Sequence, residues 1–314
     1  MIRSLTADRN ETWPALPLAD WSDTYATLHM WTQIVGKVRL ALSPHLNHWW
    51  EVPLYVNARG LTTSAIPYED QVFEIRFDFI SDELEIFTSW GARRTSPLQP
   101  QTVADFYHAF FAALRELDIH VDIWPMPVEV PDPIRFDQDR THAAYDAEQV
   151  YRFWRILVTI EPIFREFRAR FVGKSSPVHF FWGSFDLAVS RFSGRRAPAR
   201  PGADVITREA YSHEVSSAGF WPGGGQVTGP AFYSYAVPEP AGFRTVRVQP
   251  AEARYDPSLN EFLLMYDDVR ASPAPEAKLL DFLQSTYEAA AELGGWDRDA
   301  LESSPRTGAP IAVG

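Results

Sequence analysis

The sequence contains no cysteine, and this absence removes several kinds of chemistry at once. Disulfide bonds, thiolate zinc sites, iron–sulfur clusters and a cysteine nucleophile all need that side chain. The sequence also lacks a long hydrophobic run of the roughly 18 residues that a membrane-spanning helix needs. Residues 1–17 carry charges at Arg3, Asp8, Arg9 and Glu11 and show no apolar core of a signal peptide. We therefore expect a cytoplasmic protein that does not enter a membrane.

Positive charge is scarce as well. The chain has 29 Lys and Arg against 41 Asp and Glu, which gives a formal net charge of −12. A nucleic-acid partner held by phosphate contacts is therefore not expected. One basic cluster departs from the trend and comprises Arg191, Arg195, Arg196 and Arg200. It is suited either to bidentate contact with an anion or to the exposed start of a loop, and both interpretations stay open.

Aromatic residues, by contrast, are abundant. They make up 14% of the chain and include 11 tryptophans, while hydrophobic residues reach 46% and charged residues 22%. The last two values are typical of folded globular proteins rather than of disordered chains. Because each large ring buries about 150–250 Å², the aromatic residues are expected to fill the core and to line part of a cleft.

The first half of the chain predicts a helix, a meander of strands and a second helix. The first helix covers about residues 23–42, with Asp23 as N-cap, and its apolar face consists of Trp31, Ile34, Val35, Val38 and Leu42. Extended segments follow at residues 49–57, 61–66, 72–80 and 83–89. The second helix covers residues 103–117 with Thr102 as N-cap, and residues 120–130 are predicted to form an edge strand.

The second half repeats this order. A long helix begins near Ala147 and contains Pro162, which is expected to kink it. Extended segments are predicted at residues 179–192, 231–237 and 261–269, before a last helix at 275–293 that begins with proline and is followed by Gly294. The predicted organisation is an arm (1–22), a first half (23–130), a linker (131–145), a second half (146–296) with an insertion (193–230), and a tail (297–314).

The two halves also resemble each other at one junction. A histidine precedes an aromatic pair in each (His48 and His179), and an arginine follows eleven or twelve residues later (Arg59 and Arg191). We therefore predict an α+β fold made of two similar helix–antiparallel meander–helix halves, the second with a long loop insertion, and we expect the halves to superpose.

Three stretches are unusual enough to be compared with known families. They read WSDTYATLHMWTQIVGKVRLALSPHLNHWWEVPLYVNARGLTTSAIPY from Trp21, VHFFWGSFDLAVSRFSGRR from Val178 and YSHEVSSAGFWPGGG from Tyr211. These stretches resemble the DUF5996 family of uncharacterised bacterial proteins, and the resemblance extends from Trp13 to about Trp296. The family implies no activity, substrate, cofactor or catalytic residue.

The first helix carries a polar stripe opposite its apolar face. The stripe consists of His29, Thr32, Gln33, Gly36 and Lys37. One interpretation is a solvated face. The other is a helix that borders a cleft, with His29 and Gln33 reaching a ligand and Gly36 admitting a close neighbour.

Two further histidines begin strands. His48 and His179 are suited to proton transfer near neutral pH, although a histidine beside tryptophans is also typical of a packed, hydrogen-bonded residue. If residues 179–192 form one unbroken strand, His179 and Asp186 point to opposite faces and cooperate only if Gly183 forms a bulge.

The insertion provides the remaining candidates. His213 and Glu214 form a potential acid–base pair, Trp221 a stacking surface, and Gly223 begins a glycine triplet that suits close backbone approach or a hinge. We predict that residues 211–225 cover a functional cavity; a free surface loop is the alternative.

These features favour recognition of a small polar or anionic ligand in a groove between the halves, with general acid–base chemistry by His213, Glu214 or His179. The candidate ligand-binding residues are His29, Gln33, His48, Arg59, Arg191, Trp221 and Gly223. Two alternatives remain: a non-catalytic protein-interaction module, and a metal-dependent hydrolase that uses His213, Glu214, His179 and Asp186. No motif assigns a cofactor or a metal, and the oligomeric state stays open.

Overall fold

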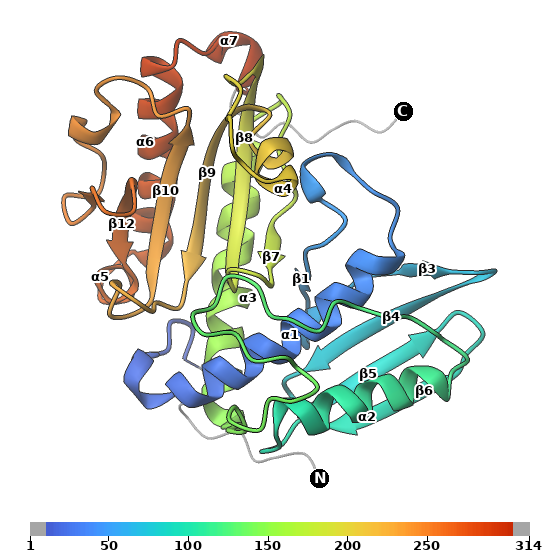
Figure 1. Cartoon of the computed structure of the whole chain (residues 1–314). Helices are drawn as coiled ribbons and strands as arrows, with labels where there is room; N and C mark the ends of the chain where they lie inside the picture. Colours follow the sequence, from blue (N-terminus) through green and yellow to red (C-terminus); the bar gives the residue numbers. More distant parts are fainter. Residues whose placement is uncertain (1–10, 304–314) are drawn as a thin grey trace, which may run out of the picture. The chain divides into compact units, whose positions relative to one another are not determined.

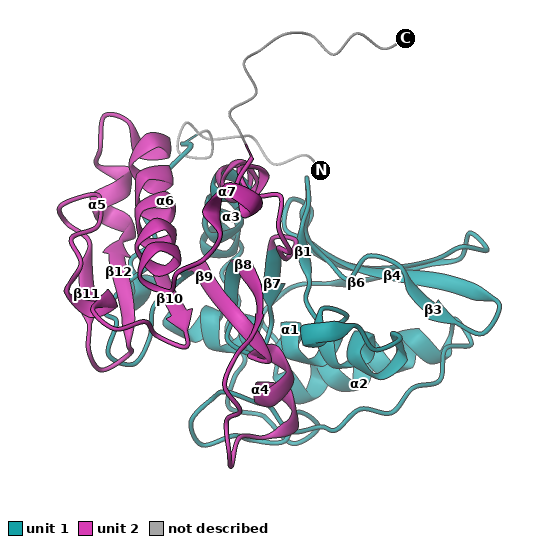
Figure 2. Cartoon of the chain, turned by 90° about the horizontal axis from the view of Figure 1, so that it is seen from above, with its two compact units in different colours: residues 1–161, 179–188, 220–231 teal, residues 162–178, 189–219, 232–314 magenta. Residues whose placement is uncertain are grey.

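The computed structural model describes residues 11–303 and shows helices together with two six-stranded antiparallel sheets (Figure 1). The α+β class is therefore confirmed. The chain divides into two compact units (Figure 2). Unit 1 comprises residues 1–161, 179–188 and 220–231, and unit 2 comprises residues 162–178, 189–219 and 232–314.

The first long helix, α1 (Ser22–Leu42), follows a short 3₁₀ turn, η2 (Leu18–Asp20), and ends at Ser43. Asp23 lies in its first turn and is not the N-cap, which is Trp21. The helix is buried on almost every side from Thr27 to Arg39, and its polar residues are buried with its apolar ones. The interpretation of the polar stripe as a solvated face is therefore wrong.

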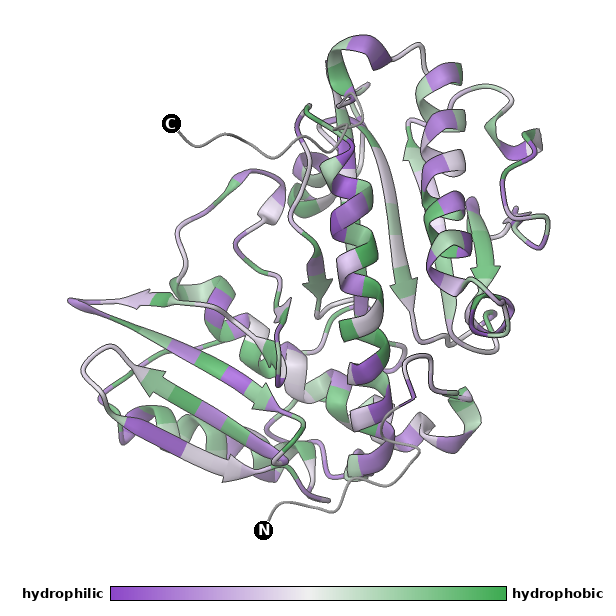
Figure 3. Ribbon diagram, turned by 180° about the vertical axis from the view of Figure 1, so that it is seen from behind, coloured by the Kyte–Doolittle hydropathy of each residue, from purple (hydrophilic) through white to green (hydrophobic). Residues whose placement is uncertain are grey.

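The first sheet belongs to unit 1 and has the strand order β1-β2-β4-β5-β6, with β3 also paired to β4. The strands are β1 (Tyr55–Val56), β2 (Gly60–Thr62), β3 (Ile66–Tyr68), β4 (Gln71–Asp78), β5 (Glu83–Thr88) and β6 (Arg93–Pro97). Hydrophobic and hydrophilic residues alternate along β4 (Figure 3), and its alternate residues Phe73, Ile75 and Phe77 are buried. Each of the four segments predicted to be extended contains a strand, whereas β6 was not predicted.

Two helices cover one face of this sheet, α1 and α2 (Val103–Arg115) (Figures 1 and 2). The Trp31 indole of α1 stacks on Phe106 of α2 with ring centroids 4.7 Å apart. Thr102 caps α2 by accepting a hydrogen bond from the Asp105 N–H at 3.1 Å, as predicted. The edge strand predicted at residues 120–130 is absent, because its two prolines remove ladder donors and side chains hold the segment instead.

Residues 131–145 contain no helix or strand, yet Phe136 and Asp139 are fully buried there. The helix α3 (Ala147–Ala169) follows and continues through Pro162. The boundary between the two units falls at this proline.

The second sheet has the strand order β11-β12-β10-β9-β8-β7. Its strands are β7 (His179–Phe181), β8 (Asp186–Arg196), β9 (His213–Trp221), β10 (Ala231–Val237), β11 (Arg254–Asp256) and β12 (Glu261–Met265). The predicted insertion is therefore not a loop. It contains the end of β8, the helix α4 (Val205–Ala210) and the interior strand β9.

The segment predicted as one strand from residue 179 to 192 is a hairpin of β7 and β8. Phe181 pairs with Asp186 and His179 with Ala188, so residues 182–185 form the connection. Gly183 lies in this connection and does not form a bulge. Phe185 takes a left-handed conformation (φ 58°), which turns the chain back. Since paired residues share a face of a hairpin, His179 and Asp186 lie on the same face.

The remaining helices follow the second sheet. They are α5 (Tyr266–Arg270), α6 (Pro275–Leu293) and α7 (Arg298–Leu301), with the 3₁₀ turns η3 (Asn47–Trp49) and η4 (Phe243–Thr245) elsewhere in the chain. The bounds of α6 agree with the prediction, whereas the segment predicted to be extended to residue 269 changes from β12 to α5 at Tyr266.

The internal duplication is not confirmed. In each half the strands of a sheet do lie between helices along the sequence. The residues expected to correspond have different environments, however. His48 lies in a 3₁₀ turn and His179 in a strand. The Arg59 side chain is 43% exposed, whereas Arg191 is fully buried.

Residues 11–303 contain no helix that is both long enough and apolar enough to cross a membrane.

Candidate functional site

Four polar residues of α1 follow one another at helical spacing on one face: Tyr25, His29, Gln33 and Lys37. The last three are 7%, 0% and 6% exposed, and Tyr25 is half-buried. The loop of residues 120–130 and the β7–β8 connection contact this face within unit 1. Tyr25 thus extends the predicted stripe, and these four residues, the polar stripe from here on, are the framework of the candidate site.

Gln33 holds the loop of residues 120–130 against α1. Its Nε2 donates to the carbonyl oxygen of Val128 at 2.9 Å, and its Oε1 accepts from the Val128 N–H at 2.8 Å. Both polar atoms of the side chain are therefore engaged by protein backbone. Gln33 positions the loop and has no group left over for a ligand.

His29 is engaged in a similar way. Its Nε2 lies 2.9 Å from the carbonyl oxygen of Gly183 and 3.0 Å from the amide nitrogen of Gln33. Burial lowers the pKa of His29 to about 4, although the nearby carbonyls of Gly183 and Trp182 partly oppose the shift. The imidazole is thus neutral at physiological pH and acts as a hydrogen-bonding contact between α1 and the β7–β8 connection.

The β7–β8 connection packs against α1 through Trp182. Its indole lies so close to Gly36 that a Cβ on this glycine would be 2.3 Å from the ring. The indole Nε1 donates to the carbonyl oxygen of Val52 at 2.8 Å. Trp182 is therefore the close neighbour that Gly36 admits, and its ring is fixed in position.

Lys37 is the unusual group of the site. Its Nζ lies 4.9 Å from the ring centroid of Trp124 and 5.7 Å from that of Trp182. Within residues 11–303 the ammonium group makes no hydrogen bond or ion pair with the protein. Burial lowers its pKa to about 8. A cation held between two indoles without a counter-ion is a suitable receptor for an anion, and its neutral form is a nucleophile.

Acidic residues lie at the β7–β8 end of the stripe. Asp186 is 6% exposed and accepts a hydrogen bond from Ser184. Partial burial of the Glu129 carboxyl group, with the charge of Asp186, raises its pKa, and burial raises the pKa of Tyr25 to about 12. None of these carboxylates forms an ion pair with Lys37.

The other candidates of unit 1 make structural contacts. His179 is fully buried among Trp50, Tyr55 and Phe181, with ring centroids 5.3–5.9 Å away. His48 has a left-handed backbone (φ 60°) and its ring lies 5.4 Å from that of Trp50. Both histidines thus belong to one aromatic cluster.

Arg59, Trp221 and Gly223 complete the candidates of unit 1. Arg59 pairs with the buried Asp78. The Trp221 indole donates a hydrogen bond to the hydroxyl of Tyr25, so it does contact the polar stripe. Gly223 has a left-handed backbone (φ 96°) in a tight turn, where a Cβ would lie 2.6 Å from the carbonyl oxygen of Gly229. The conformational freedom of this glycine is therefore required by the turn.

Unit 2 contains the other three candidates, beginning with Arg191. Its guanidinium carbon lies 3.5 Å from the ring centroid of Phe167 and 4.2 Å from that of Tyr287. One terminal nitrogen donates to the carbonyl oxygen of Phe167, while Nε and the other terminal nitrogen have no partner within residues 11–303. Burial lowers its pKa to about 9.

His213 and Glu214 are neighbours on β9 and therefore point to opposite faces of the sheet. The Glu214 carboxylate pairs with Arg195 at 2.7 Å and accepts from the Ser193 hydroxyl at 2.8 Å. The imidazole Nδ1 of His213 contacts the hydroxyl of Ser212 at 3.0 Å. The predicted acid–base pair is therefore not formed by these two side chains.

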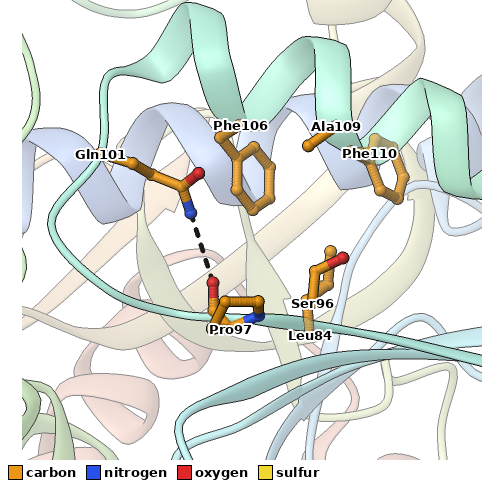
Figure 4. A pocket seen from close by; sticks show the side chains of 7 residues that line it. All are labelled: Leu84, Ser96, Pro97, Gln101, Phe106, Ala109 and Phe110. Atoms are coloured by element: carbon orange, nitrogen blue, oxygen red, sulfur yellow. Dashed lines mark hydrogen bonds between the residues drawn. The ribbon is translucent and has the colours of Figure 1, made fainter.

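Two of the small cavities among the described residues lie between a helix and strands. One, of about 110 Å³, lies between α2 and the strands β5 and β6, and its wall includes Phe106, Phe110 and Leu84 (Figure 4). The other, of about 100 Å³, is in unit 2 and includes Glu214 and Trp296. The first is largely apolar; Gln101 at its edge donates to the carbonyl oxygen of Pro97 at 3.3 Å. Neither cavity includes the polar stripe of α1.

Within residues 11–303 no three His, Asp or Glu side chains are grouped to hold a metal ion. His179 and Asp186, named for the hydrolase alternative, belong to unit 1, whereas His213 and Glu214 belong to unit 2.

Sequence reasoning noted Lys37 but did not select it, and it missed Trp124 and Trp182. One signal was available, because Lys37, Lys174 and Lys278 are the only lysines in a sequence that otherwise uses arginine as its cation. Because lysine is so scarce in this sequence, a lysine in the middle of a helix that is buried on almost every side is unusual.

Comparison with known proteins gives a single kind of match. No curated protein and no solved structure matches the chain. The family model described as "Family of unknown function (DUF5996)" matches residues 13–303, which is nearly the whole chain. The chain therefore belongs to the DUF5996 family.

Proposed function

We propose that the protein binds a small organic anion and that Lys37 supplies the charge that holds it. One observation carries the proposal: the ammonium group is buried and has no counter-ion among residues 11–303. Burying an unpaired charge costs several kcal/mol, and an anion bound beside it would offset this cost. Cation–π contacts to the two indoles stabilise the ammonium only in part.

The route to Lys37 involves Trp124. This residue lies in the loop of residues 120–130 and is 65% exposed, whereas Trp182, the other indole near the ammonium group, is 7% exposed and hydrogen-bonded. A turn of the Trp124 side chain therefore admits a ligand without disturbing the core. Gln33 keeps the backbone of this loop in place during such a movement.

The pH dependence of binding follows from the same lysine. An anion binds the protonated amine, and the pKa of Lys37 is about 8 in the free protein. Affinity is then constant below pH 8 and falls about tenfold for each pH unit above it. Burial is the cause of the lowered pKa, and no neighbouring charge contributes to it.

The test uses protein labelled with ¹³C at the lysine side chains, which gives separate signals for Lys37, Lys174 and Lys278. Lactate and benzoate serve as probes. We expect each to shift the Lys37 signal selectively and to raise its titration midpoint above 8. Lys37→Met should weaken binding at least tenfold while the protein stays folded, and Lys278→Met should leave it unchanged.

Lys278 is a suitable control because it is already paired, with Glu252 at 2.7 Å. If the anions shift all three lysine signals equally, or if the Lys37→Met variant binds as well as the natural chain, the proposal is wrong.

A cytoplasmic location and the lack of a nucleic-acid partner stay predictions.

A further inference from the structure

We propose that Lys37 also acts as a nucleophile and forms an imine with a small 2-oxo acid. This inference rests on the proposed function, because it takes the bound anion to be an oxo acid and adds a covalent step at the same nitrogen. The chemistry needs an amine that is uncommitted to other contacts, an apolar site and a route for the carbonyl compound.

The environment of Lys37 meets these conditions. Its Nζ has no protein acceptor or counter-ion within residues 11–303, so no hydrogen bond or ion pair must be broken before it reacts. The two indoles lie beside it, and Trp124 is the exposed one, whose turn would admit the ligand. An apolar environment disfavours the ammonium form and leaves the nitrogen lone pair available.

The magnitude of this effect is large. At pH 7.5 an amine of pKa about 8 is unprotonated in about a quarter of the molecules, against about one in a thousand for a lysine at its model value of 10.5. Lys37 therefore has a population of free amine more than a hundredfold above that of an ordinary lysine, by this order-of-magnitude estimate.

The covalent step balances without another reactant. The Nζ lone pair forms a bond to the carbonyl carbon, and one amine proton passes to the former carbonyl oxygen, which gives a carbinolamine. Loss of water then forms the C=N bond, and uptake of one proton at the nitrogen gives the iminium ion. No oxidant or reductant takes part.

A 2-oxo acid is favoured over a neutral ketone for an electrostatic reason. The iminium ion places a positive charge where no carboxylate of residues 11–303 pairs with Lys37. The carboxylate next to the carbonyl of a 2-oxo acid lies beside that charge and neutralises it. A neutral ketone would leave the buried charge uncompensated.

The other two lysines are internal controls. Lys278 donates to Glu252 at 2.7 Å and to the carbonyl oxygen of Asp268 at 3.0 Å. Lys174 lies over the ring of Phe192 at 5.2 Å. Neither has the two-indole environment of Lys37.

The experiment treats the full chain with pyruvate and sodium cyanoborohydride at pH 7.5 and maps the carboxyethyl groups by peptide mass spectrometry. We expect Lys37 to be labelled at least tenfold faster than Lys174 or Lys278, and acetone to label it more slowly than pyruvate. Lys37→Arg, which keeps a cation, should lose the fast labelling. Equal labelling of the three lysines, or none, overturns the proposal.

Lactate separates this inference from the proposed function. It has the charge of pyruvate but no carbonyl group, so it can bind and cannot form an imine. If lactate shifts the Lys37 signal while pyruvate leaves no label, the imine is wrong and anion binding stands. If the Lys37→Arg variant does not fold, the natural chain is labelled with pyruvate in the presence of excess lactate instead. The proposal then requires that lactate slows the labelling of Lys37 alone.

Discussion

At the scale of single residues, buried polar side chains distinguish this protein. His29, Gln33, Lys37 and Arg191 are each at most 7% exposed. The first two are paired with backbone groups far away in the sequence, 154 and 95 residues distant. The last two are cations that have no carboxylate partner in the described part of the chain. Their pairing decides which of them serve the fold and which are available to a ligand.

His29 should make stability depend on pH. Its pKa is about 4 in the folded chain and near 6.5 in the unfolded chain, so the unfolded state binds more protons between these values. Stability is fully present above pH 6.5 and falls by about 3 kcal/mol as the pH decreases to 4. Chemical denaturation should show that the His29→Gln variant loses less stability between pH 6.5 and 4 than the natural chain does. His108→Gln, at an exposed position, should lose as much as the natural chain.

Gln33→Ala should destabilise the protein by about 2 kcal/mol, because the N–H and C=O of Val128 would both lose their partner. Gln101 is the control, since it makes a single exposed hydrogen bond, and its replacement by alanine should cost less than about 0.5 kcal/mol. Equal midpoints of urea unfolding for the two variants would show that Gln33 does not hold the loop.

At the scale of elements, α2 and α6 were predictable because local signals set their ends. Thr102 caps α2 through the N–H of Asp105, and proline begins α6. β9 was not predictable. Six consecutive residues, from Val215 to Phe220, are buried and most are small, so the strand lacks the alternation that marks a half-exposed one.

The burial of the polar stripe of α1 could not be predicted from the sequence pattern either. Its spacing was visible in the sequence, but its burial depends on contacts with Val128 and Gly183, which no local pattern reveals. The site residues were therefore predicted as a stripe, and Gln33 and His29 were assigned to a ligand although they bind backbone. Lys37 belongs to the same stripe and was passed over.

Gly36 tests the packing between α1 and the β7–β8 connection. In an exposed helix, glycine to alanine would stabilise by up to about 1 kcal/mol. Here the new Cβ would lie 2.3 Å from the Trp182 ring, which is hydrogen-bonded in place, so Gly36→Ala should destabilise. In a double-mutant cycle, Trp182→Ala should remove this penalty; additive effects would mean that the two residues do not meet.

At the scale of the whole molecule, the chain passes repeatedly between the two units, after residues 161, 178, 188, 219 and 231. Unit 1 therefore depends on two later segments, residues 179–188 and 220–231. These supply Phe180, Phe185 and Phe220, all fully buried.

A fragment of residues 1–161 should consequently fail to fold, although it holds most of unit 1. Leaving out three buried phenylalanines costs about 3–5 kcal/mol for each, comparable in sum to the whole stability of a domain. Near-ultraviolet circular dichroism and amide dispersion in NMR spectra provide the measurement, with the full chain as reference. A fragment with native-like dispersion would show that the later segments are dispensable.

The same threading has a consequence for inheritance. No single break in the gene separates the two units. A break after residue 161 leaves two segments of unit 1 in the C-terminal fragment, and a break after residue 231 leaves two segments of unit 2 in the N-terminal fragment. Recombination at one point therefore cannot transfer either unit alone to another protein. We therefore expect such a chain to be inherited as one block, and the family match covers residues 13–303.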